Sequence, residues 1–63
     1  MLVLSRLVHE KIIITVPGCK RIEITVCSIW PKGVKLGINA PLEFQVHREE
    51  VQQEIDREAL ANQ

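Results

Sequence analysis

The side chains in this sequence that are most capable of chemistry are two histidines and two cysteines. A nucleophile with its base would need Cys19 or Cys27 to meet His9 or His47, yet no spacing places them together. The two cysteines are eight positions apart, which matches no zinc-binding pattern. The sequence also has no glycine-rich phosphate loop and no paired-carboxylate signature. We therefore expect no enzymatic activity, no metal site and no cofactor.

Two arginines and one histidine have surroundings that suit binding better than catalysis. Arg48 follows a short polar and apolar alternation and precedes acidic residues typical of a helix start, so it should lie at a strand-to-helix corner. Arg6 interrupts an apolar N-terminal segment, where it is either a surface charge or a guanidinium that reaches a phosphate or a base edge. His47 is either a hydrogen-bonded surface residue or a direct contact to a ligand.

The charges of the chain are divided between its two ends although the formal net charge is zero. Residues 1–48 hold seven lysines and arginines against three glutamates, a net of +4, and residues 49–63 hold one arginine against five acids, a net of −4. A basic body with an acidic tail can still present a positive face to a nucleic acid. The same division also fits a solvated acidic helix beside an ordinary sheet.

The hydrophobic pattern predicts a mainly β fold of five short antiparallel strands followed by a C-terminal helix, in one domain over residues 1–63. The expected strands cover residues 1–8, 11–16, 21–30, 34–39 and 43–47, the helix covers about 48–59, and a frayed tail covers 60–63. Pro17-Gly18 and Pro31-Lys32-Gly33 have the residues that tight turns require.

Length and composition predict that the chain does not fold alone. Of its 63 residues, 46% are hydrophobic, which is more than so small a monomer can bury. Residues 1–8 are apolar on both faces of the expected strand, and open strand edges are normally paired or covered. A homodimer that exchanges strands would satisfy both requirements.

The compartment is predicted from the same features. The opening apolar run contains Arg6 and lacks the basic start of a signal peptide, and no stretch approaches the roughly 20 apolar residues of a membrane span. Two isolated cysteines suit a reducing environment. We expect a cytoplasmic protein that is not inserted in a membrane.

Three sequence stretches closely resemble the carbon storage regulator family (CsrA/RsmA), which comprises small dimeric RNA-binding regulators of translation. They are MLVLSR over residues 1–6, GINAP over residues 37–41 and VHREEV over residues 46–51. Any one of these stretches is weak by itself, but together at this chain length they are specific. Residues 11–33 match the family only in pattern.

The resemblance implies an intertwined homodimer in which the first and fifth strands pair with strands of the other chain. It also implies binding of a GGA triplet, usually in a hairpin loop of mRNA, between strand one of one subunit and strand five of the other. Binding near a ribosome entry site would repress translation initiation or alter message stability, and small RNAs or a protein antagonist could sequester the protein. The implied contact residues are Leu4, Ser5, Arg6, Ala40, Pro41, Gln45, Val46, His47 and Arg48.

The chain departs from the family pattern at several positions. Leu7 and Leu42 stand where basic residues are usual, and His9 replaces a usual glycine in a turn. Loss of two basic positions should weaken RNA binding. Leu7 is either at the rim of the RNA groove or part of the packing surface beside Met1 and Val3.

Two other functions fit the same residues. The first is a β-rich dimeric protein-interaction module that keeps the fold but binds a protein, and the second is a DNA-binding dimer with swapped β-strands. Binding to a GGA hairpin, to a matched hairpin without GGA and to duplex DNA would separate the three functions.

Overall fold

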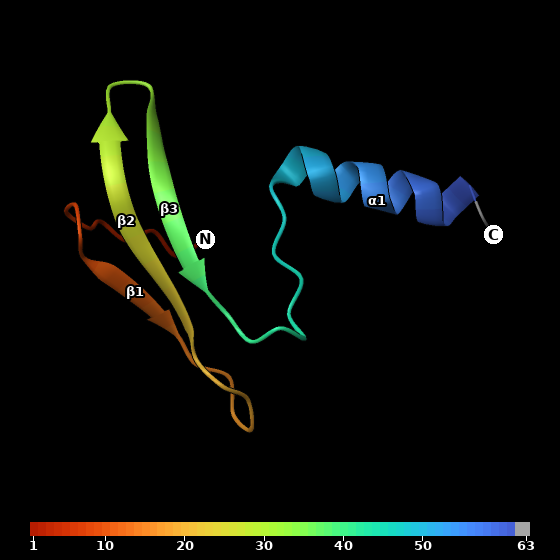
Figure 1. The fold of residues 1–63 in the computed structure, drawn as a ribbon, viewed down its shortest axis with the longest axis horizontal. Coiled ribbons are helices and arrows are strands. Elements are labelled where there is room, and N and C mark those ends of the chain that lie inside the picture. The colour runs from red at the N-terminus through yellow and green to blue at the C-terminus, as the bar shows by residue number, and fades with distance from the viewer. Residues whose placement is uncertain (62–63) are drawn as a thin grey trace.

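The computed structural model describes residues 1–61 and contains a three-stranded sheet and one helix (Figure 1). The strands are β1 (Lys11–Ile14), β2 (Ile22–Trp30) and β3 (Gly33–Asn39), and the helix is α1 (Glu49–Ala61). The sheet is antiparallel with the order β1-β2-β3, so β1 and β3 are both edges. The mainly β fold with a C-terminal helix is therefore confirmed.

The two hairpin turns form where the sequence predicts them. Gly18 has a φ of 79°, a value that only glycine adopts without strain, and the N–H of Cys19 donates to the carbonyl of Val16 at 2.9 Å. At the other turn, the indole of Trp30 lies so close to Gly33 that a Cβ there would approach the ring to 2.7 Å. Glycine suits that position because any side chain there would displace the Trp30 ring.

One face of the sheet is entirely aliphatic, and a β-bulge keeps it so. The ladder is regular up to the pair Val26–Leu36 and then shifts, so that the next pairs are Ser28–Lys35 and Ile29–Val34. Cys27 is thus an extra residue, and Ile29 stays on the same face as Val26 instead of crossing to the other. We call this surface the aliphatic face; it consists of Ile12, Ile14, Ile22, Ile24, Val26, Ile29, Val34, Leu36 and Ile38.

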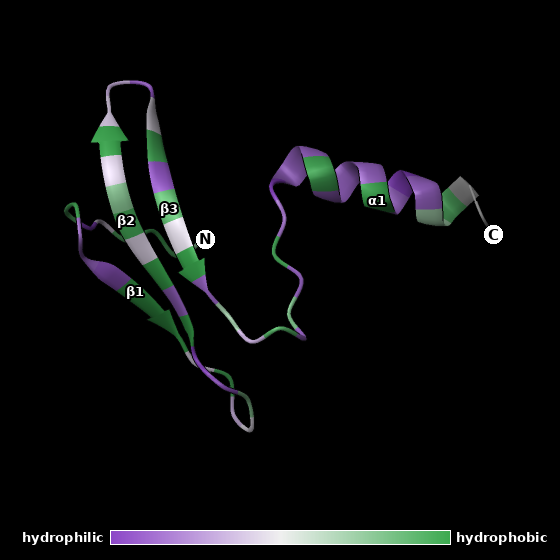
Figure 2. Cartoon of the chain, in the orientation of Figure 1, coloured by the Kyte–Doolittle hydropathy of each residue, from purple (hydrophilic) through white to green (hydrophobic). Residues whose placement is uncertain are grey.

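The aliphatic face is largely open in the single chain, so the protomer has almost no core. Val26, 8% exposed, is the only buried residue whose burial is described. The radius of gyration is 14.7 Å, whereas a compact domain of this length has about 10.6 Å. The accessible surface is 5914 Å², against roughly 4100 Å² for a compact protein of this mass. Figure 2 shows the hydrophobic residues spread along the strands.

Two predicted strands are not formed in this chain. Residues 1–8 and 43–47 are outside the sheet, and a turn from Pro41 to Phe44 occupies part of the second segment. The alternation of both segments suits a strand, but a strand also needs a neighbour with which to exchange hydrogen bonds. The remaining strands are close to their predicted bounds, with residues 15, 16 and 21 left outside and Gly33 added.

Helix α1 begins at the predicted corner and continues past its predicted end. The carbonyl of Arg48 accepts from the N–H groups of Val51 at 3.1 Å and Gln52 at 3.0 Å, and acidic Glu49 and Glu50 occupy the first turn. The helix reaches Ala61, two residues beyond its predicted end, and residues 62–63 of the predicted tail lie outside the described part. None of its described Cα atoms is within 8 Å of a strand Cα.

Candidate nucleic-acid interface

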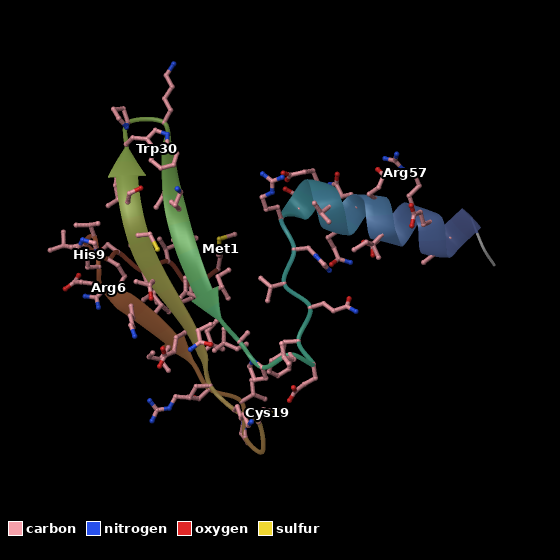
Figure 3. The ribbon with its side chains drawn as sticks, in the orientation of Figure 1. Met1, Arg6, His9, Cys19, Trp30 and Arg57 are labelled. Atoms are coloured by element: carbon pink, nitrogen blue, oxygen red, sulfur yellow. The ribbon has the colours of Figure 1, made fainter. Side chains whose placement is uncertain are left out.

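The first group of predicted contact residues lies beside the start of β1. Leu4, Ser5 and Arg6 line an open pocket together with Lys11, Ile12 and Ile13 of that strand. A second, adjoining pocket is lined by Ser5, Arg6, Leu7 and Glu10. The N-terminal segment and the first strand therefore form one surface, with Arg6 in the wall of both pockets. Figure 3 shows Arg6 beside the start of β1.

The guanidinium of Arg6 is held by three acceptors of its own chain. Its Nε donates to the carbonyl of Ser5 at 3.1 Å, its Nη1 donates to the carbonyl of Lys11 at 3.3 Å, and its Nη2 lies 3.1 Å from the carboxylate of Glu10. The Arg6 side chain remains 40% exposed. It is therefore oriented before any ligand arrives, which lowers the entropy lost when it binds.

A tight turn joins this segment to the sheet and places His9 in an unusual conformation. The N–H of Glu10 donates to the carbonyl of Leu7 at 3.1 Å, which closes the turn, and His9 has a φ of 69°. This left-handed conformation strains most residues other than glycine. The strain is tolerated because the N–H of His9 donates to the carbonyl of Val26 at 2.7 Å and so ties the turn to β2.

The second group of predicted residues occupies the connection between β3 and α1. Ala40 and Pro41 are half-buried where the strand ends, and the N–H of Phe44 donates to the carbonyl of Pro41 at 3.0 Å. The remaining members follow the turn and are all exposed; they are Gln45, Val46, His47 and Arg48. The backbone groups of residues 45–47 have no hydrogen-bond partner within residues 1–61, so this stretch offers them and its polar side chains to a partner.

Arg48 is the most accessible cationic group of the connection. Its side chain is 80% exposed and its Nε lies 3.2 Å from the carboxylate of Glu50, which is 65% exposed. An exposed pair of this kind contributes at most about 1 kcal/mol, so an incoming phosphate or base can displace Glu50 at little cost. Arg48 is thus available for binding.

The two groups are not joined within one chain. Among residues 1–61, no hydrogen bond or ion pair connects the Leu4–Arg6 group with the 40–48 group. The structure adds Glu10 and Lys11 to the first group, and neither residue was predicted from the sequence. The four-residue separation of Arg6 and Glu10 was the available signal, although such spacing is informative mainly on helices.

The remaining reactive side chains form no site in the described structure. Cys19 and Cys27 are free and exposed, and residues 1–61 contain no group of three or more potential metal ligands. The one helix found there is too short and too polar to cross a membrane.

Comparison with known proteins identifies the family. Residues 1–57 match the model of the CsrA "Global regulator protein family". The translational regulator CsrA of Treponema pallidum (strain Nichols) is 41% identical over 61 residues, which cover 97% of this chain and 78% of that protein. No solved structure matches significantly. The predicted resemblance is confirmed, and this chain belongs to the CsrA global regulator family.

Proposed function

We propose that this chain regulates translation by binding single-stranded GGA loops of mRNA near ribosome entry sites, where it represses initiation or alters message stability. Family membership and the likeness to a translational regulator support the regulatory role. The observation that carries the RNA site is the fixed guanidinium of Arg6 at the wall of two open pockets. A guanidinium with free N–H groups suits both phosphates and base edges.

The proposed mode of recognition relies on arginine and backbone groups rather than on aromatic stacking. RNA-binding sheets often stack bases on exposed aromatic side chains. Here Phe44 is half-buried and Trp30 covers Gly33 at the distant end of the β2–β3 hairpin. Bases splayed from a loop would instead meet the exposed backbone of residues 45–47 and the guanidinium of Arg48.

The proposed active form is a homodimer. The accessible surface exceeds that of a compact protein by roughly 1800 Å² per chain, or about 3600 Å² for two chains. Obligate homodimers bury about 2000–5000 Å², so a second copy is sufficient to cover the excess. The most exposed apolar side chains include Met1 at 115%, Leu2 at 82% and Val3 at 80%, in the segment that lacks a strand neighbour.

Dimerisation would also complete the RNA site. β3 has a free edge, and residues 1–8 and 43–47 have strand-like alternation without a partner strand. If these segments pair with strands of the second chain, Arg6 of one protomer comes close to Arg48 of the other, and symmetry gives a pair of equivalent sites. We place the protein in the cytoplasm, where small RNAs with many GGA loops or a protein antagonist could sequester it.

A mobility-shift titration tests this function. The probes are an RNA hairpin with GGA in its loop, the same hairpin with CCA, and duplex DNA of equal length. Preference for the GGA hairpin supports the proposal, and tighter binding to duplex DNA refutes it in favour of the DNA-binding dimer. Equal or absent binding of all probes also refutes it.

One observation keeps a protein-interaction module as the second candidate. Leu42 is 101% exposed and Leu7 is 71% exposed, and both stand where the family resemblance places basic residues. Exposed leucines in place of cations favour contact with an apolar protein surface over contact with phosphates. Absent binding of all three nucleic acids would favour this candidate.

A further inference from the structure

Glu10 connects the N-terminal turn, the sheet and Arg6 through one carboxylate. Its Oε1 atom accepts from the backbone N–H of Leu7 at 2.8 Å and lies 3.1 Å from Nη2 of Arg6. The backbone of Glu10 is itself fixed, because its carbonyl accepts from the N–H of Val26 at 3.0 Å. The carboxylate is therefore not a mobile surface charge. Its own backbone is bonded to β2, and its Oε1 atom is bonded to the backbone of Leu7.

The remaining hydrogen-bonding capacity of Arg6 follows from its contacts. Nε–H, one N–H of Nη1 and one N–H of Nη2 are directed to Ser5, Lys11 and Glu10 respectively. One N–H group on each terminal nitrogen has no partner among the described residues. We call these two N–H groups the fork, because a guanidinium can use one N–H of each terminal nitrogen to donate two parallel hydrogen bonds to a guanine edge or a phosphate.

The negative charge of Glu10 changes what this fork attracts. A carboxylate 3.1 Å from the guanidinium offsets its positive charge, so Arg6 contributes less to the long-range attraction of any polyanion. Its directional hydrogen bonds are retained. Arg6 therefore contributes less to phosphate contacts, which carry no sequence information, and relatively more to hydrogen bonds with a base edge.

We propose that Glu10 is a positioning residue that determines RNA specificity through Arg6. It fixes the guanidinium fork towards a base edge and lowers the attraction of Arg6 for arbitrary phosphates. This inference rests on the proposed RNA-binding function. An acidic residue weakens the overall attraction to RNA. In this role Glu10 nevertheless increases the discrimination between RNA sequences.

The test compares Glu10→Gln with the parent chain of 63 residues. The amide oxygen of Gln still accepts from Leu7, whereas the charge is removed. Glu54→Gln is the matched control, because Glu54 pairs with Arg57 at 3.5 Å on α1, outside both groups of candidate contact residues. Affinities for the GGA and CCA hairpins are measured over a range of salt concentrations.

For Glu10→Gln we expect the GGA-to-CCA affinity ratio to fall by roughly five- to 150-fold, the discrimination that one bidentate base contact provides. The salt dependence should become steeper by about 0.7 log units per log unit of salt, as for one added phosphate contact. The control should retain the parent ratio and slope. A Glu10→Gln protein with the parent ratio and slope overturns the inference.

Two further measurements keep the result unambiguous. Arg6→Lys keeps the charge but lacks the fork, so it should lose the GGA preference without a steeper slope; a retained preference overturns the inference even if Glu10→Gln does not fold. Without RNA, NMR should show slower exchange of the Arg6 Nη2 hydrogens in the parent than in Glu10→Gln, because the Glu10 carboxylate lies against Nη2. If hydrogen exchange at Arg6 is the same in both proteins, the inference fails. If the parent itself does not distinguish GGA from CCA, the proposed function is refuted, and the specificity role is refuted with it.

Discussion

Replacing Leu36 by alanine measures whether a second chain covers the aliphatic face. Leu36 is 48% exposed in the protomer, so truncation in an isolated chain should lower the free energy of unfolding by only about 1 kcal/mol, half the value of a fully buried leucine. If a second copy covers the face, the leucine becomes a core residue. Its loss then costs about 2–5 kcal/mol per chain, or roughly 4–10 kcal/mol per dimer.

Thermal unfolding followed by circular dichroism over a wide range of chain concentrations distinguishes the two cases. For a dimer that unfolds as it dissociates, the Tm rises with concentration, and Leu36→Ala lowers it at every concentration. Lys35→Ala is the matched control, since Lys35 is the neighbouring residue of β3 on the opposite face. A Tm independent of concentration, a loss near 1 kcal/mol and light scattering from a folded 7.2 kDa monomer would together refute the dimer.

The other predictions concern the candidate RNA site. Arg48→Ala should lose about 2–5 kcal/mol of GGA-RNA binding free energy in a mobility-shift titration and stay dimeric. Arg57→Ala on α1 should bind like the parent. If both variants bind GGA RNA as tightly as the parent, the site lies elsewhere. Leu7→Arg should bind RNA more tightly, with a salt slope steeper by about 0.7, because Leu7 is 71% exposed beside Arg6; a lower Tm would show instead that Leu7 is packed in the dimer. His9→Gly should raise the free energy of unfolding in urea by about 0.5–1 kcal/mol, since relief of the left-handed strain exceeds the added chain entropy; a decrease would show that the histidine ring makes a stabilising contact.

Local chemistry made the hairpins predictable. Pro17-Gly18 and Gly33 each meet a steric requirement that few other residues satisfy, so the turns and the strands beside them follow from the sequence. The bulge at Cys27 has no such signal, because its conformation suits many residues. The predicted strands over residues 1–8 and 43–47 have correct alternation, but whether they form depends on a neighbour that a single chain does not supply.

The candidate site was predictable only in its two halves. The family motifs point to Arg6 and Arg48, and the structure places both at exposed positions, but the pairing of the halves stays a prediction because it requires a second chain. The position of Glu10 could not be derived from spacing, since it depends on the turn at His9. The backbone conformation of the turn, more than the residue type, determines which side chain pairs with the Arg6 guanidinium.

The bulge at Cys27 adds one residue to β2 without changing the face on which the last residues of the strand lie. Without Cys27, ordinary alternation would place Ser28 opposite the aliphatic face and Ile29 on it, which is the arrangement already present. Removing any regular strand residue before it, such as Thr25, would instead turn every following side chain to the wrong side. Cys27 is therefore a position in β2 where this chain can lose one residue, by a single-codon deletion, and keep both the faces of the strand and the pairs of the hairpin tip.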